Sequence, residues 1–237
     1  MIDNVEQYLN IPLIEPQKIP IKTIIEQLNP GAQDKKLLES HVASVYLISL
    51  LNEQTIRVRH YKDDHYSFYA IYVLKVKLKK PDSISDVVRM LHNTFPESTL
   101  LLIDDGKVNY ISGASKRINK NDNTKTVVED IVISKVESNS LEYLSFKQFK
   151  AINLKEFNEE LTDVIYKIRV LNATGIYPQN QLDYISLIRE YDELSQQINY
   201  LKEQYNSASM MSEKAKIDDE LFNKEKELQQ LINKLGG

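Results

Sequence analysis

The sequence contains no cysteine and very little glycine. Of its 237 residues, 6 are glycine, compared with about 17 at the usual ~7% usage. The absence of cysteine excludes thiol nucleophiles, disulfides, Cys-ligated zinc and iron–sulfur clusters. The internal glycines Gly31, Gly106, Gly113 and Gly175 lie at least seven residues apart. Because dinucleotide fingerprints and phosphate-binding P-loops need clustered glycines, both motifs are excluded, and we expect no cofactor.

Long apolar runs and an excess of positive charge are also missing. No stretch approaches the ~20 apolar residues of a membrane span, and the first residues, Met-Ile-Asp-Asn-Val-Glu, lack a basic signal-peptide region. We therefore expect a cytoplasmic protein without membrane contact. The net charge is −4, and residues 182–237 carry all of it, with 7 Lys/Arg against 11 Asp/Glu. The neutral remainder lacks the global charge of a DNA-coating protein, although local basic faces remain open.

The first 175 residues predict an α+β domain in which helices flank an antiparallel sheet of about five strands. Four prolines among residues 1–33 indicate an extended arm, and Ser83 begins a capping-box-like helix start. Apolar periodicity predicts helices over 21–28, 34–51, 83–95 and 154–171. Alternation and β-branched runs predict strands over 55–60, 66–79, 100–103, 107–111 and 126–136, with a polar loop over 112–125.

Residues 178–237 predict a second domain, an α-helical hairpin or coiled coil. Two apolar seams with heptad spacing occur there, and they are out of phase with each other. Either the heptad pattern contains a discontinuity, or residues 206–212 form a turn. We favour the turn, because this stretch is rich in Ser and Asn and a folded-back hairpin buries both seams. The predicted partner-binding positions are Leu187, Tyr191, Leu194, Ile198, Leu201, Tyr205, Leu221, Leu228 and Leu231.

A basic face of the sheet is the candidate nucleic-acid site. Cationic side chains that repeat along strands can follow phosphates, and an aromatic ring can stack on a base. The competing interpretation is a solvated sheet face on which lysines protect an edge from aggregation. The residues predicted to form the site are Arg57, Arg59, Tyr69, Lys75, Lys77, Lys79, Lys116, Arg117 and Lys120.

Two acidic clusters are the candidates for metal-dependent chemistry. Asp63 and Asp64 lie between His60 and His65, and Asp104-Asp105 precedes a glycine. Carboxylates of this kind bind Mg²⁺ in nucleases. The alternative is that both clusters are turns whose Asp side chains cap the backbone. We assign no catalytic and no metal-binding residue from these patterns.

The order of these features resembles the bacterial domain-of-unknown-function family number 4391. The matching segments are Lys18-Ile19-Pro20, residues 42–58, the strand at 69–78, Phe95-Pro96 with 100–103, residues 110–116 and the helical end from Tyr184. The chain departs from the family at Ile21, which precedes Lys22, and at Ala70 and Ile71, where an acid often leads the strand. The resemblance singles out Lys22 and Lys116 as phosphate or partner contacts.

The resemblance implies a context, not a mechanism. Members of this family look like accessory components encoded beside superfamily-2 helicases and DNA methyltransferases in restriction-like phage-defence loci. We therefore expect a non-enzymatic adaptor subunit that binds such a partner through its helical tail and DNA through its basic face. The alternatives are a divergent metal-dependent nuclease and a purely structural coiled-coil homodimer.

Overall fold

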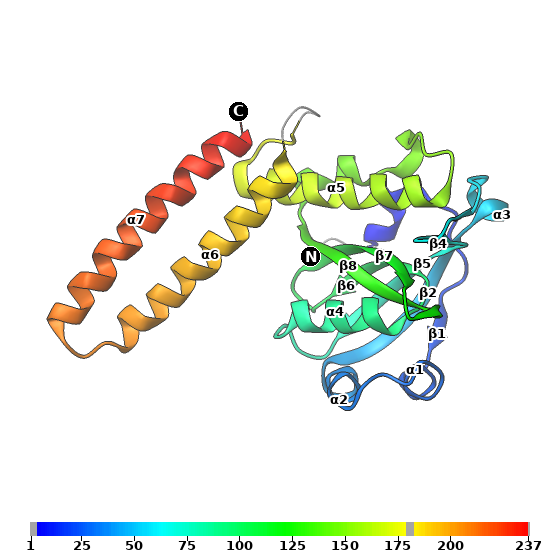
Figure 1. Cartoon of the computed structure of the whole chain (residues 1–237), viewed down its shortest axis with the longest axis horizontal. Coiled ribbons are helices and arrows are strands. Elements are labelled where there is room, and N and C mark those ends of the chain that lie inside the picture. The colour runs from blue at the N-terminus through cyan, green and yellow to red at the C-terminus, as the bar shows by residue number, and fades with distance from the viewer. Residues whose placement is uncertain (1–3, 179–182, 237) are drawn as a thin grey trace. The chain divides into compact units, whose positions relative to one another are not determined.

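The chain folds into two compact units, residues 1–168 and 169–237 (Figure 1). The computed structural model describes residues 4–178 and 183–236, except for the side chains of residues 27, 28, 123 and 124. The boundary between the units falls inside helix α5, Leu154–Thr174. Across the described residues, no helix combines the length and the apolar character needed to cross a membrane.

A six-stranded mixed sheet forms the centre of the first unit, in the order β1-β2-β5-β6-β7-β8. Its only parallel pair is β5 with β6, and helix α4, Ile84–Thr94, makes the crossover between them. The α+β class is thus confirmed, whereas the expected purely antiparallel sheet of about five strands is wrong. The strands are β1 Gln17–Ile19, β2 Val42–Leu51, β5 Ile71–Leu78, β6 Ser98–Asp104, β7 Asn109–Asn119 and β8 Asp122–Val136.

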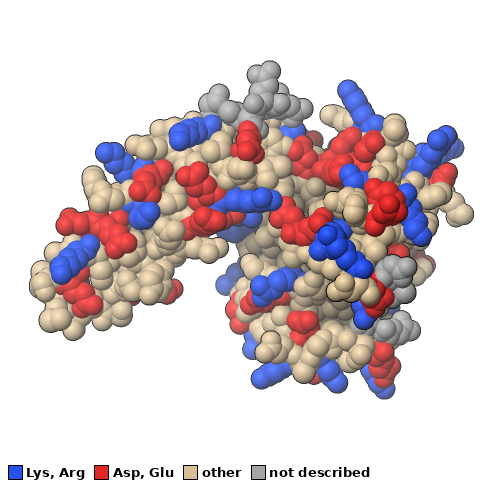
Figure 2. Space-filling model, in the orientation of Figure 1, with Lys and Arg blue, Asp and Glu red and all other residues tan. Residues whose placement is uncertain are grey.

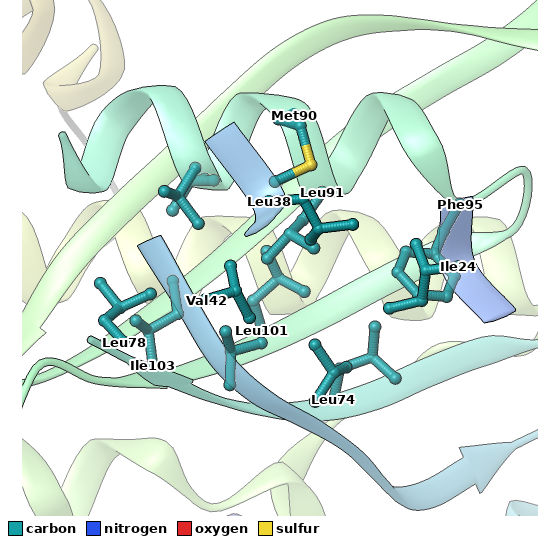
Figure 3. Close-up of a cluster of buried hydrophobic side chains, with 14 residues drawn as sticks. Ile24, Leu38, Val42, Leu74, Leu78, Met90, Leu91, Phe95, Leu101 and Ile103 are labelled. Atoms are coloured by element: carbon teal, nitrogen blue, oxygen red, sulfur yellow. The ribbon is translucent and has the colours of Figure 1, made fainter. Parts of the chain in front are cut away.

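Helices α1 (Ile21–Leu28), α2 (Ala32–His41) and α4 bury an apolar cluster against one face of the sheet. Leu38 and Leu91 of these helices meet Leu74 and Leu101 of the central strands (Figure 3). All four side chains are fully buried. A buried leucine contributes about 1.5–3 kcal/mol to folding, so this cluster is a main source of stability for the unit.

Helix α5 packs on strand β7 through Gly113. A Cβ atom at this glycine would lie 2.9 Å from Leu161 Cδ2, 3.1 Å from Thr162 Cγ2 and 3.2 Å from Ile165 Cδ1. The absence of a side chain therefore permits the close approach of the helix. The predicted polar loop over 112–125 is wrong, because β7 and β8 continue through it as an antiparallel pair.

Two further segments differ from the sequence prediction. The expected helix over 34–51 ends at His41, and β2 follows, because its uncharged run of ten residues pairs with β1 on one side and β5 on the other. The expected strand over 55–60 is wrong: Asn52 caps a short helix, α3 (Glu53–Ile56), instead. Ser83 adopts a positive φ of 60° without a side-chain cap, so the predicted capping box is also wrong.

Small elements complete the first unit. The expected strand over 66–79 divides into β4, Ser67–Phe68, which pairs with β3, Tyr61–Lys62, and the separate strand β5. The 3-10 helices are η1 Val5–Leu9, η2 Ser138–Leu144 and η3 Phe146–Gln148.

Helices α6, Tyr184–Ser207, and α7, Met211–Gly236, make up most of the second unit. Ile198 and Leu201 of α6 form a buried cluster with Ile217 and Leu221 of α7. An ion pair of 2.9 Å between Lys202 Nζ and Glu225 Oε1 also joins the two helices. Four of the apolar positions that the heptad spacing identified therefore pack together between α6 and α7.

The close approach at Gly113 predicts sensitivity to a single added methyl group. We expect Gly113→Ala to lower the free energy of unfolding by about 1–3 kcal/mol, because three side-chain atoms of α5 crowd the new Cβ. Urea denaturation measures the change. Gly31→Ala is the control, since its nearest neighbour is Asp34 Oδ2 at 3.9 Å. Equal stability losses at the two glycines would contradict the packing argument.

Candidate functional site

An open groove of about 670 Å³ lies between the segment after α3 and the start of α5. Arg57, Arg59 and His60 line one side, and Ala151, Ile152 and Asn153 line the other. Four exposed side chains, those of Arg57, Arg59, His60 and Ile152, therefore line one hollow, and two of them are arginines. The groove is our candidate functional site because it combines shape, charge and exposed apolar surface.

Two backbone constraints fix the basic side of the groove. Arg57 ends α3 in the left-handed region, with φ 59°, and its N–H donates to Glu53 O at 3.2 Å. Glycine or asparagine usually occupies such a C-cap, because a β-carbon there is unfavourable by roughly 1–2 kcal/mol. Two residues later, Arg59 forms a β-bridge with Asn153, and its carbonyl accepts the N–H of Leu154 at 2.8 Å. The arginine segment is thus held against the first turn of α5.

The first turn of α5 satisfies its own backbone donors. Asn153 Oδ1 accepts the N–H of Glu156 at 3.0 Å, and Asn153 Nδ2 donates to Glu156 Oε1 at 2.8 Å. The second oxygen of that carboxylate accepts the N–H of Ile152 at 3.0 Å. Because these groups cap each other, the positive charge of the groove comes from the arginines and not from the helix terminus.

Aromatic and apolar surface lies beside the arginines. The rings of His60 and Tyr69 stack, with centroids 5.7 Å apart and an interplanar angle of 21°. Tyr69 is 49% exposed and Ile152 is 72% exposed. The carboxylate of Glu53 lies 3.2 Å from His60 Nδ1. In the part of the chain that the structure describes, neither arginine forms an ion pair, so both guanidinium groups can bind an anion.

The predicted continuous basic sheet face is wrong. Arg57 and Arg59 lie outside the sheet, and Lys75 forms an ion pair of 2.7 Å with Glu6. Arg117 Nε lies 3.1 Å from Glu129 Oε1. The ammonium group of Lys79 donates to Glu39 O at 2.5 Å. Of the predicted lysines, Lys77 is exposed on β5 and Lys120 is exposed in the turn after β7.

Lys116 lies in the protein interior and not at the surface. It is only 4% exposed, and its Nζ donates to the carbonyl oxygens of Phe95 and Glu97, each at 2.7 Å. Burial lowers the pKa of Lys116 to about 7, although the nearby carboxylate of Glu97 opposes that shift. The position therefore ties β7 to the segment after α4. The other position that the family resemblance singled out, Lys22, is exposed and lies 3.6 Å from Glu26.

The buried side chain of His92, on α4, connects this helix to strands β6 and β7. His92 Nδ1 lies 2.7 Å from Thr99 Oγ1, and Nε2 lies 3.0 Å from Ser112 Oγ, which donates to Val132 O. Burial, with the neighbouring charge of Lys116 as a second cause, lowers the pKa of His92 to about 3. Both His92 and Ser112 are fully buried, so they connect the helix to the sheet and a substrate cannot reach them. The sequence signal that could have identified His92 is a histidine among the apolar positions of a predicted helix.

The aspartates of the two acidic clusters stabilise turns by accepting hydrogen bonds. Asp63 Oδ1 accepts the N–H groups of His65 at 2.7 Å and Tyr66 at 2.6 Å, and the other oxygen accepts the hydroxyl of Tyr61. These hydrogen bonds, that of Tyr61 first, lower the pKa of Asp63. Asp64 lies beside it, exposed in the same turn.

The second cluster behaves in the same way. Asp104 accepts the N–H of Gly106, and Asp105 accepts those of Lys107 and Val108. The turn-capping interpretation is confirmed for Asp63, Asp104 and Asp105. Within residues 4–178 and 183–236, no group of three or more His, Asp and Glu side chains is arranged to hold a metal ion.

All members of the predicted partner-binding seam are buried or partly buried. Its buried members are Leu194, Ile198, Leu201, Leu221 and Leu231, and its partly buried members are Leu187, Tyr191, Tyr205 and Leu228. The large apolar side chains that stay exposed on α6, on α7 and between them are Tyr200, Met210, Met211 and Phe222. A partner that leaves the helix pair intact would contact these exposed side chains.

The buried lysine predicts a specific pH dependence of stability. The folded-state pKa of about 7 lies below the unfolded value of 10.5, so between these limits the unfolded chain binds one more proton. The free energy of unfolding, relative to Lys116→Met, should rise with pH by up to about 1.4 kcal/mol per unit. Urea denaturation from pH 6 to 10 measures it, with the exposed Lys77→Met as control. Parallel curves for the wild type and Lys116→Met would refute the burial argument.

Comparison with known proteins places this architecture in a family. No curated protein and no solved structure matches the chain. The family Domain of unknown function (DUF4391) matches residues 14–228, which include the sheet, the groove and most of the helix pair. The chain therefore belongs to the DUF4391 family.

Proposed function

We propose that this protein is a non-enzymatic accessory subunit that docks a protein partner through its helical unit. The observation that carries this proposal is the exposure of large apolar side chains on α6, on α7 and between them. Met211 is 83% exposed and Phe222 is 69% exposed, although the pair has already buried its own seam. Burying these side chains against a partner would remove apolar surface from water, at about 25 cal/mol per Å².

The end of the helix pair has the character of an adaptable binding surface. Met210 and Met211 are adjacent and exposed where the chain passes from α6 to α7. Methionine side chains are flexible and polarisable, which suits them to irregular partner surfaces. On the face of the two helices that Figure 2 shows, acidic and basic residues intermingle, so this face offers opposite charges to a partner without a single-sign field.

The family resemblance supports the class of partner that we propose. We propose that the partner is a helicase-like or DNA methyltransferase protein of a bacterial phage-defence locus, in which this chain acts as an adaptor in the cytoplasm. In this proposal α6 and α7 act as a coiled-coil hairpin, and the α+β unit remains free for a second contact.

Nucleic acid is the second candidate ligand, and the site proposed for it is the groove. The supporting observation is that Arg57 and Arg59 line one hollow and remain free of ion pairs within the described residues. Charge-assisted hydrogen bonds from guanidinium groups suit phosphate oxygens. The groove thus replaces the basic sheet face as the proposed nucleic-acid contact.

Docking predicts that the exposed apolar side chains are needed for complex formation. The tagged full chain is expressed together with the genes that flank it, and the retained proteins are identified by mass spectrometry. We expect a helicase-like or methyltransferase protein to co-purify. The combined change Met210→Ser, Met211→Ser and Phe222→Ser should lower its retention about ten-fold, which corresponds to about 1.4 kcal/mol.

The control is Lys77→Ala, an exposed position on β5 that should leave retention unchanged. Equal retention by the triple variant and the wild type would reject the docking role. A stable homodimer in light scattering, disrupted by the same triple change, would favour the structural homodimer. Mg²⁺- or Mn²⁺-dependent cleavage that Asp63→Ala or Asp104→Ala removes would favour the nuclease.

A further inference from the structure

We infer that the groove binds single-stranded nucleic acid, with Arg57 and Arg59 on its phosphates and an unpaired base against the Tyr69–His60 stack. This inference rests on the proposed nucleic-acid contact and deepens it by naming the strandedness and the mode of binding. It does not depend on the docking role of α6 and α7.

The phosphate part of the site consists of two guanidinium groups on one short segment. Arg57 and Arg59 are two residues apart, exposed, and line the same hollow. The β-bridge of Arg59 to Asn153 orders the segment before any ligand binds. An ordered site loses less conformational entropy on binding than a flexible one, which favours affinity for a ligand of matching charge.

The conformation of Arg57 supports a role for its side chain. This residue adopts a left-handed C-cap, with φ 59°, at which glycine would be unstrained. Its side chain makes no ion pair within the described residues that would offset the strain. Strained backbone positions of this kind cluster at functional sites. The glycine variant can therefore remove the guanidinium group without disturbing the turn.

The base-binding part of the site is aromatic. Tyr69 is 49% exposed, and His60 packs almost parallel to it at 5.7 Å, which fixes the orientation of the ring. Ile152, 72% exposed, adds apolar surface on the opposite side of the groove. A base that stacks on such a ring contributes about 1–3 kcal/mol, and every base can do so.

Strandedness follows from the small number of cations that line the groove. Duplex binding without base contacts relies on many phosphate contacts. Arg57 and Arg59 are the arginine or lysine residues among those that line the groove, and of the other predicted cations Lys75 and Arg117 are in ion pairs and Lys116 is buried. The groove, about 670 Å³, lies in the size range of a small-molecule pocket. Only a single strand can turn a base out of its stack into such a hollow without breaking a base pair.

The test uses the purified full chain and fluorescence anisotropy with labelled oligonucleotides. The probes are a 20-mer of dT, a 20-mer of rU and a 20-bp duplex, with UMP as competitor, at several salt concentrations. We expect either single strand to bind at least about ten-fold more tightly than the duplex, since base stacking is available only to the single strand. The dT and rU arms show whether DNA or RNA is preferred, and UMP competition shows whether one nucleotide suffices.

The variants separate the two parts of the site. Arg57→Gly and Arg59→Ala should each weaken binding about ten-fold and reduce the slope of log K against log salt by about 0.7. Tyr69→Ala should weaken single-strand binding about ten-fold or more and leave that slope unchanged. Lys35→Ala, at an exposed position on α2, is the matched control and should bind as the wild type does. Thermal unfolding of each variant checks that the fold is retained.

Three results would overturn the inference. Duplex binding as tight as single-strand binding, with dependence on Arg57 and Arg59, would reject the single-strand mode and keep the proposed nucleic-acid contact. Unchanged single-strand binding by folded Tyr69→Ala would reject the stacking role. No binding to any probe would reject both the inference and the nucleic-acid contact, and would leave the docking proposal to its own co-purification test.

Discussion

The contact between α5 and β7 at Gly113 is the constraint on which the candidate site depends. Only a residue without a side chain lets Leu161 and Ile165 approach the strand so closely. The seated helix brings its capped first turn to the segment after α3, where the chain bridges between Arg59 and Asn153. Without the contact between α5 and β7, the distance between the arginine segment and the start of α5 would not be fixed. Packing between helix and sheet thus determines the geometry of a surface site.

On the face of the sheet opposite α5, polar side chains connect helix α4 to the strands. His92 spans from α4 to Thr99 and Ser112, and Lys116 satisfies two carbonyl oxygens after the same helix. Interior hydrogen bonds of this kind add directional specificity to the apolar cluster around them. They also remove Lys116 from the surface. The charges that remain for a ligand are therefore decided in part by which cations the fold uses internally.

The two units divide the chemistry of the protein between them. The α+β unit carries the arginines and the stacked rings, whereas the helix pair carries exposed Met and Phe side chains. The sequence pattern identified Arg57, Arg59 and Tyr69 as ligand contacts but assigned them to a sheet face, because residues 55–60 and 66–79 both have patterns typical of strands. It missed Ile152 and Asn153, which come from a distant part of the chain and carry no motif.

The sequence by itself determined the local elements whose pattern is complete within one segment. The periodicity of 154–171 and of the two C-terminal seams predicted helices that the structure contains, because i, i+3 and i+4 spacing is a property of a single helix. Tertiary structure alone decided that Val42–Leu51 is a strand and that Lys116 is buried. An uncharged run can form a helix or a strand, and pairing with the neighbouring strands decides between them. A lysine is buried only where carbonyl oxygens from distant segments accept hydrogen bonds from its ammonium group.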